Sequence, residues 1–91
     1  MKYRYVLKPE WIERISAFEE FANGATQVSI KTKGGQVFHE ILVSNGMYVV
    51  AMRNRDDLPF SLSDIADIFQ TEEDKNPKRR GGWQFWDTWN K

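Results

Sequence analysis

Residues 26–53, TQVSIKTKGGQVFHEILVSNGMYVVAMR, decide the fold of this chain. Apolar and polar side chains alternate along much of this stretch with a period of two, which is typical of strands with one buried face. Two glycine turns, Gly34-Gly35 and Asn45-Gly46, interrupt the alternation, and both suit the positive φ angles of tight hairpins. The stretch therefore predicts three consecutive antiparallel strands joined by two tight turns.

Two-residue turns at these glycines would fix which residues face each other across the strands. The expected strands cover residues 26–31, 37–44 and 47–53. Their expected cross-strand pairs are Val28 with Ile41, Ile30 with His39, Val43 with Tyr48, and Ile41 with Val50. The middle strand is apolar on its second face too, at Phe38 and Leu42, with Val49 opposite Leu42. Because a strand that is apolar on both faces is usually covered on both, the pattern favours a strongly bent sheet or small barrel.

The residues before this meander predict a strand and then a helix. Residues 2–8, KYRYVLK, alternate with a period of two and indicate a short edge strand. Residues 9–24 change to helical spacing, with Pro9 at the first helical position and Gly24 as a left-handed C-terminal cap. The apolar positions of this helix are Trp11, Ile12, Ile15, Phe18, Phe21 and Ala22.

The residues after the meander are less regular. Residues 53–57 read as a polar loop, and residues 58–62, LPFSL, as a short strand that Pro59 confines to an edge. Residues 63–70, SDIADIFQ, fit either a helical turn or a tight turn followed by a strand. We prefer the turn followed by a strand.

The expected fold class is α+β, with an N-terminal strand and helix followed by a strongly bent antiparallel sheet or small barrel of four to five strands. An aromatic C-terminal segment ends the chain. We expect residues 1–70 to form a single globular domain, because the chain is below the size at which cores split. Residues 71–82 then form a polar linker, and residues 83–91 an aromatic segment that packs on the domain or on a partner.

The order of these elements resembles the Sm-like and SH3-like small β-barrels. IKTKGGQVFHEILVS, residues 30–44, is similar to the first Sm hairpin, in which a charged turn with glycine leads into a bent second strand. The resemblance covers about half the chain and implies a curled barrel. Sm-like proteins hold RNA with an Asp-x-aromatic-x-Asn loop and an Arg-Gly pair, where this chain has SNG and LPFSL. None of the family's RNA-binding residues carries over to this sequence.

The sequence offers little for catalysis or metal binding. It has no cysteine, which excludes disulfides, thiolate catalysis and thiolate metal ligands. His39 is the only histidine, and no recognisable motif places a nucleophile or second base beside it. The acidic residues lack the spacing of a calcium loop. We therefore expect a protein that is not an enzyme, with no catalytic residue, no cofactor and no metal site.

The strongest functional signal is the C-terminal stretch RRGGWQFWDTWNK, residues 79–91. Its aromatic side chains either cover the Phe38 and Leu42 face of the sheet or form a contact surface. As a contact surface they would anchor a partner protein or a second copy of the chain, because Trp and Arg are frequent at interface hot spots. The expected partner-binding residues are Arg79, Arg80, Trp83, Phe85, Trp86 and Trp89.

We therefore expect a small interaction module that binds a protein partner or itself. The alternative is a small nucleic-acid-binding protein, in which basic side chains attract phosphates and aromatic rings stack on nucleobases. The residues expected to serve this alternative, besides the C-terminal aromatic ones, are Lys31, Lys33, Arg53, Arg55 and Lys78. No stretch approaches the roughly 18 apolar residues of a membrane span, so we expect a cytoplasmic protein without membrane contact.

Overall fold

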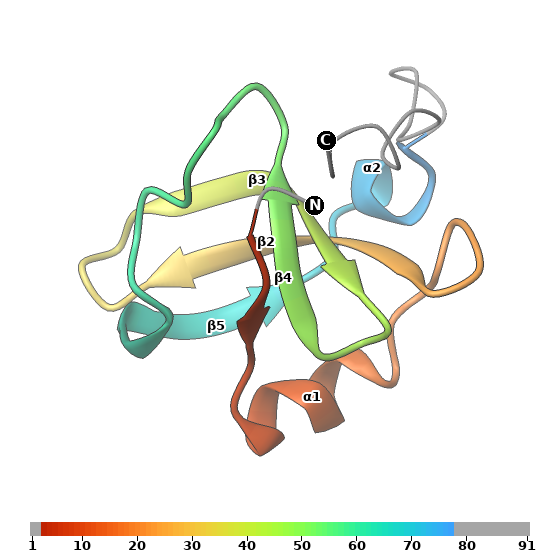
Figure 1. Ribbon diagram of the computed structural model, residues 1–91, viewed down its shortest axis with the longest axis horizontal. Coiled ribbons are helices and arrows are strands. Elements are labelled where there is room, and N and C mark those ends of the chain that lie inside the picture. The colour runs from red at the N-terminus through yellow and green to blue at the C-terminus, as the bar shows by residue number, and fades with distance from the viewer. Residues whose placement is uncertain (1–2, 78–91) are drawn as a thin grey trace.

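The strands predicted between residues 26 and 53 form the centre of a five-stranded antiparallel sheet (Figure 1). The computed structural model describes residues 3–77. Along the chain the elements are β1 (Tyr5–Val6), α1 (Pro9–Ile15), β2 (Ala25–Thr32), β3 (Val37–Ser44), β4 (Tyr48–Met52), the 3₁₀ helix η1 (Leu62–Asp64), β5 (Ile65–Phe69) and α2 (Glu72–Lys75). The N-terminal strand and helix and the antiparallel sheet confirm the predicted α+β fold.

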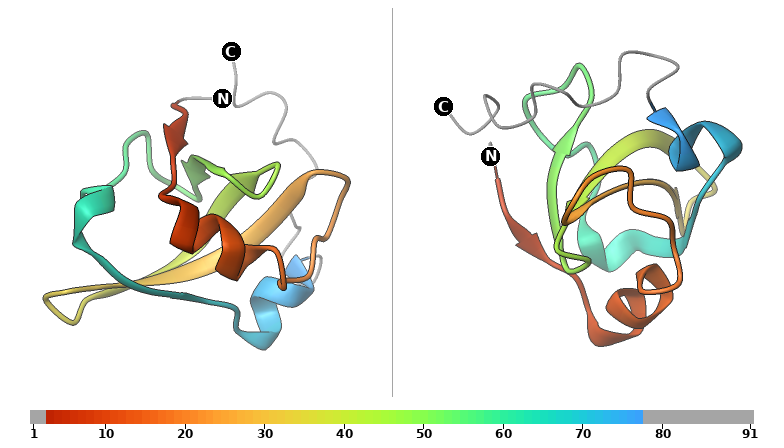
Figure 2. Two further views of the ribbon diagram at one scale, coloured as in Figure 1. Left: turned by 90° about the horizontal axis from the view of Figure 1, so that it is seen from below. Right: turned by 90° about the vertical axis from the view of Figure 1, so that its right-hand side faces the viewer.

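The sheet has the strand order β1-β4-β3-β2-β5 and curls into a half-barrel (Figure 2). Two hairpins connect β2, β3 and β4, and β1 and β5 occupy the two edges, so the edge position predicted for β1 is confirmed. In Figure 1, α1 lies next to β1 and below β5. The α1 residue Ile15 is buried in the same cluster as the strand residues, so the helix closes this side of the sheet.

Hydrophobic side chains form two separate clusters. The main core lies on the α1 side and consists of Leu7, Ile15, Val28, Ile30, Ile41, Val43, Val49, Ile65 and Ile68. The second-face cluster is smaller and consists of Ala25, Leu42, Val50 and Ala51. Both faces of β3 are therefore covered, as its two apolar faces predict.

The β2–β3 pairing differs from the predicted register near its turn. The turn holds residues 33–35 rather than two glycines, and Gly35 has the positive φ of 88°. A type I turn followed by a left-handed glycine is the usual form of a three-residue hairpin loop. Because the loop has three residues and not the predicted two, the pairing shifts by one residue, and Ile30 faces Phe38 and not the predicted His39.

An irregularity in β3 restores the predicted pairing further from the turn. Val28 faces Ile41 as predicted, which leaves His39 and Glu40 together opposite Ser29. Glu40 has a φ of 58°, a left-handed conformation that is strained for a residue with a side chain. The bulge changes which side chains share a face, since one extra residue reverses the alternation.

The bulge separates the two residues that the sequence placed on one apolar face. Phe38 packs against the main core, whereas Leu42 belongs to the second-face cluster. The predicted face of Phe38 and Leu42 therefore does not exist as one surface. A C-terminal segment that covered Leu42 would not also cover Phe38.

The β3–β4 pairing is shifted in a similar way. Asn45 and Gly46 have the predicted positive φ, at 55° and 70°, but the turn also includes Met47. The observed pairs are Ser44 with Tyr48, Val43 with Val49, Leu42 with Ala51, and Ile41 with Met52. The predicted pairs Val43–Tyr48, Ile41–Val50 and Leu42–Val49 are therefore wrong.

Replacing Gly46 by valine is expected to cost about 1 to 3 kcal/mol of stability, because a β-branched residue is strained at positive φ. A Cβ at Gly46 would meet no atom within 4 Å, so backbone strain alone should produce the loss. Gly34→Val is the control, since the φ of Gly34 lies outside the left-handed region. Urea unfolding of both variants measures the difference, and equal losses would contradict this account.

The helix α1 ends at Ile15, well before the predicted end at Gly24. Backbone bonds to the third residue before continue through Phe18, whose N–H donates to Ile15 O at 2.9 Å. At Glu19 a side chain takes their place: Glu19 N donates to Gln70 Oε1 at 3.0 Å, and Gln70 Nε2 donates to Glu19 O at 2.9 Å. Gly24 has the expected positive φ of 75°, but it lies in the turn before β2. A tertiary contact from beyond β5 therefore outweighs the helical pattern of this segment.

The segment after β4 contains one wrong and one confirmed prediction. Residues 58–62 do not form the predicted strand and run as an irregular segment into η1. Residues 63–70 form a turn followed by β5, as preferred from the sequence. The predicted linker 71–82 begins with α2, which packs on β2 through the buried Asp74, while residues 83–91 lie outside the described part of the chain.

Candidate interaction surface

β1 is an edge strand with exposed apolar side chains. Tyr5 is 46% exposed and Val6 is 63% exposed. β1 pairs with β4 on one side and is the last strand of the sheet, so within the described part of the chain no strand pairs with its other side. Exposed apolar edge strands are templates for pairing with a further chain.

A hollow of about 340 Å³ opens beside this strand. It is lined by Tyr5, Leu58, Phe60, Ser61 and Leu62, and we call it the β1 groove. Leu58, Phe60, Leu62 and the Tyr5 ring make the larger part of its lining apolar, and the hydroxyls of Tyr5 and Ser61 contribute polar groups. The hollow is therefore suited to an apolar side chain presented from an extended backbone.

The side chains that line the β1 groove are held in place by packing against neighbouring residues. Leu58, Phe60 and Leu62 pack against the main core, and the Phe60 ring stacks on Phe38 with a centroid distance of 5.0 Å. Tyr5 stacks on Tyr3 at 5.1 Å. Stacked and packed walls are pre-ordered, which lowers the entropic cost of binding.

The opposite edge of the sheet is covered by α1. Arg14 donates from Nε to the carbonyl oxygen of Ile68 in β5, and its guanidinium pairs with Asp67 at 3.0 Å. A charged side chain bonded to the edge backbone blocks strand addition there. This difference between the two edges makes β1 the accessible one.

The Tyr3 hydroxyl is buried and has no hydrogen-bond partner in the described part of the chain, and the Tyr3 ring packs against the main core. Burial raises the pKa of Tyr3 from 10.0 to about 12, and the charges of Tyr5 and Asp57 act in the same direction, while Arg55 lowers it. The folded protein therefore resists ionisation of this phenol more than the unfolded chain does.

Stability is expected to fall between pH 10 and about 12 because of Tyr3. Below pH 10 the phenol is neutral in both states, and at higher pH the unfolded chain ionises first, which favours unfolding. Tyr3→Phe should remove this part of the fall and should also stabilise the protein at neutral pH, because no buried hydroxyl is left without a partner. Tyr48→Phe is the control, and identical pH profiles for the two variants would contradict the assignment.

A buried polar network lies on the second face of the sheet. Asp74 is 1% exposed and accepts hydrogen bonds from Gln27 Nε2 at 2.8 Å, Ser29 Oγ at 2.7 Å and Thr71 N at 2.9 Å. Thr71 Oγ1 accepts from Asp74 N in return, which completes a capping box at the start of α2. The network attaches α2 to β2.

His39 extends this network to the surface, but the arrangement does not present a nucleophile. Ser29 Oγ lies 2.7 Å from His39 Nδ1. Because the Ser29 hydroxyl gives its proton to Asp74, it accepts the Nδ1 proton of His39. The Ser29 hydroxyl is fully buried, donates to Asp74 and accepts from His39, so it is not available for attack on a substrate.

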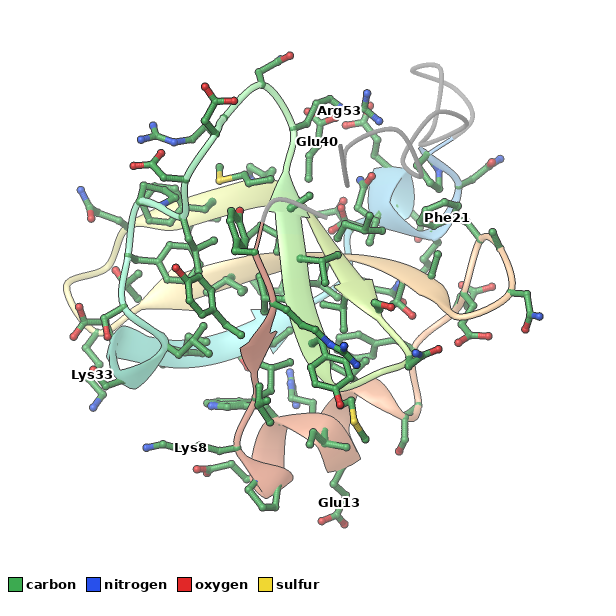
Figure 3. All side chains as sticks on the ribbon, in the orientation of Figure 1. Lys8, Glu13, Phe21, Lys33, Glu40 and Arg53 are labelled. Carbon is green, nitrogen blue, oxygen red and sulfur yellow. The ribbon has the colours of Figure 1, made fainter. Side chains whose placement is uncertain are left out.

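The structure disperses the basic residues predicted for nucleic-acid binding. Lys31 and Lys33 lie at the β2–β3 hairpin, whereas Arg53 and Arg55 lie after β4, and Figure 3 shows Lys33 and Arg53 on different sides of the molecule. Arg53 Nε lies 2.6 Å from Glu40 Oε2, and Arg55 pairs with Asp57 at 3.3 Å. Within the described residues the four bases do not form one patch.

The other predicted contact residues lie outside the described part of the chain. They are Lys78, Arg79, Arg80, Trp83, Phe85, Trp86 and Trp89. Among residues 3–77, no three His, Cys, Asp or Glu side chains are grouped so that they could hold a metal ion, and no helix is long and apolar enough to cross a bilayer.

A second hollow, of about 480 Å³, lies between α1 and the β3–β4 turn. Its apolar lining from Ile12, Ile15 and Phe18 is mixed with polar side chains such as Glu20 and Asn45. It adjoins no open strand edge, so it offers no backbone groups to an extended chain. The β1 groove is the better candidate for that reason.

No protein-family model, curated protein or solved structure matches this chain. Sequence reasoning missed the β1 groove because it treated residues 58–62 as a strand. The available signal was Leu58, Phe60 and Leu62, whose alternation around Pro59 also fits a packed irregular segment.

Proposed function

We propose that this protein is a non-catalytic interaction module that binds an extended segment of a partner protein along β1. The observation that carries the proposal is the exposed apolar edge of β1 beside the β1 groove, together with the covered edge of β5. The partner segment adds a strand to β1 through backbone hydrogen bonds and places an apolar side chain in the groove.

The curled sheet also supports the resemblance to small barrels, and we propose an Sm-like or SH3-like relationship at the level of the fold. The nucleic-acid alternative receives less support, because Arg53 and Arg55 are ion-paired with acids and lie apart from Lys31 and Lys33. Phosphate binding depends on several bases acting together.

The test begins with a displayed library of extended peptides selected on the full-length protein. Peptides that bind the wild type should bind the Leu58→Asp variant at least about tenfold more weakly, because an interface anchor in an apolar pocket is worth more than about 1.4 kcal/mol. Val37→Asp is the control for an added acid, since Val37 is apolar but lies on the β2–β3 hairpin; Leu58 is half-buried, so urea unfolding must first show that Leu58→Asp is folded. Binding should be unchanged in this control.

Three outcomes would contradict the proposal: no enriched peptide, equal binding to the Leu58→Asp variant, or full binding by a peptide with N-methylated backbone amides. N-methylation removes the donors that strand addition needs. A labelled single-stranded oligonucleotide is tested in parallel at low salt. Binding of the oligonucleotide that weakens with salt, without peptide binding, would favour the nucleic-acid alternative.

A further inference from the structure

The backbone of β1 directs its hydrogen-bonding groups to the open side of the strand at alternate residues. Leu7 N donates to Met47 O at 2.9 Å, so the backbone groups of Leu7 point toward the β4 side. Because successive residues of a strand direct these groups to opposite sides, those of Val6 and of its alternates point to the open side. These outward residues are Arg4, Val6 and Lys8. A partner strand on this edge therefore runs past these three residues.

The same three residues place a basic, an apolar and a basic side chain on one face of β1. Side chains alternate along a strand, so this face is opposite to that of Leu7, which is buried in the main core. Arg4, Val6 and Lys8 are all exposed. The Arg4 guanidinium lies 4.0 Å from the centre of the Tyr48 ring, and Tyr48 is paired with Val6, so the contact places Arg4 on the Val6 face.

The two positive charges of this face have no acidic partner in the described part of the chain. None of the ion pairs found between residues 3 and 77 includes Arg4 or Lys8. Figure 3 shows the Lys8 side chain directed away from Glu13 of α1. Stacking on Tyr48 uses one face of the Arg4 guanidinium and leaves the N–H groups at its edge available to carboxylate oxygens.

We propose that the partner segment of β1 is acidic, with a carboxylate opposite each of Arg4 and Lys8 and an apolar residue opposite Val6. This inference rests on the proposed function, since it concerns the same added strand. Opposite charges that face each other across paired strands stabilise the pair. The two intervening residues point to the other face, where the β1 groove receives an apolar side chain. The expected motif is acid-apolar-apolar-apolar-acid, which reads the same in both strand directions.

The charges also select the register of the partner segment. A shift of one residue turns both of its carboxylates to the face of the β1 groove. The larger part of the groove lining is apolar, so a carboxylate there loses water without gaining a basic partner. The pair Arg4 and Lys8 therefore favours the register in which the apolar residues enter the groove.

Binding of three labelled peptides to the full-length protein tests the inference. Their central residues are Glu-Leu-Val-Leu-Glu, Gln-Leu-Val-Leu-Gln and Lys-Leu-Val-Leu-Lys, between identical Ser-Gly flanks. We expect the Glu peptide to bind at least about threefold more tightly than the Gln peptide at low salt, and the difference to shrink with added salt, because exposed ion pairs are screened. The Lys peptide should bind more weakly than the Gln peptide.

Two outcomes separate this inference from the proposed function. Equal affinity of the Glu and Gln peptides, with both weakened by Leu58→Asp, would overturn this inference and leave the proposed function standing. No binding of any peptide to the wild type would overturn both. A single-stranded oligonucleotide that displaces the Glu peptide at equal concentration would show binding of any polyanion, and would overturn the assignment to an acidic protein segment.

Charge reversal on β1 locates the contacts. In the variant with Arg4→Glu and Lys8→Glu the order of the peptides should invert, so that the Lys peptide binds at least about threefold more tightly than the Glu peptide. The matched control carries Lys31→Glu and Lys33→Glu, which change the net charge equally at exposed positions of the β2–β3 hairpin. The control should keep the wild-type order. Equal effects of the two reversals would show long-range attraction alone and overturn the inference.

A milder variant covers the case in which the reversed protein fails to fold. Arg4→Gln with Lys8→Gln removes both charges and keeps long polar side chains on this face. Urea unfolding checks that this variant is folded, and the Glu and Gln peptides should then bind it with affinities within about twofold of each other. A preference for the Glu peptide as large as that of the wild type would overturn the inference.

Discussion

Replacing Asp74 by alanine is expected to destabilise the protein by about 3 to 5 kcal/mol, because two buried side-chain donors lose their acceptor at once. Gln27 Nε2 and Ser29 Oγ are both buried and both donate to this carboxylate, as does the backbone N–H of Thr71. A buried donor without a partner costs about 1 to 3 kcal/mol. The sum is a large share of the 5 to 15 kcal/mol that holds a typical domain together.

The neighbouring Glu72 provides the control for this prediction. Its side chain is 91% exposed and lies 3.9 Å from Lys75, so Glu72→Ala should change stability by no more than about 0.5 kcal/mol. Asp74→Asn keeps the shape of the side chain but offers one acceptor oxygen to three donors, and it should fall between the two. The measurement is the free energy of unfolding of all three variants from urea titration. A loss below about 1 kcal/mol for Asp74→Ala would show that the network contributes little to stability.

A loss of similar size, about 3 to 5 kcal/mol, is expected for Ile30→Ala. Ile30 is fully buried in β2, where it faces Phe38 of β3 on one side and Ile68 of β5 on the other. The substitution removes apolar contacts and leaves a cavity that the curled sheet has little freedom to close. The measurement is the free energy of unfolding from urea titration.

Val37→Ala is the matched control for the core prediction. Val37 also lies in the β2–β3 hairpin, but it is 44% exposed, so its truncation should cost about 0.5 kcal/mol or less. Similar losses for Ile30→Ala and Val37→Ala would mean that Ile30 is not part of the tightly packed core.

The local pattern of apolar and polar residues was sufficient to predict most strands and their order along the chain. The period of two and the glycines of both turns predicted the β2–β3–β4 meander, because alternation and positive φ are properties of a few adjacent residues. The same reasoning identified β5 after a tight turn and the edge position of β1. These features depend on little beyond the residues that form them.

Local pattern failed where a distant residue competes for the backbone. The helical spacing of residues 9–24 is real, but α1 ends at Ile15 because Gln70 binds both backbone groups of Glu19. The energies of a further helical turn and of a pair of side-chain hydrogen bonds are similar, so the sequence alone does not rank them.

Registers and sites were decided by the tertiary structure. The bulge at His39 and Glu40 places Phe38 and Leu42 on opposite faces of the sheet. The residue types at these positions do not predict a bulge. The β1 groove and the Asp74 network each join segments that are far apart in the chain. The sequence by itself determined the alternation, the positions of the turns and the α+β class, because these follow from backbone preferences over a few residues. The groove and the buried carboxylate were decided only by the folded chain, because their energies come from packing and hydrogen bonds between residues about fifty positions apart.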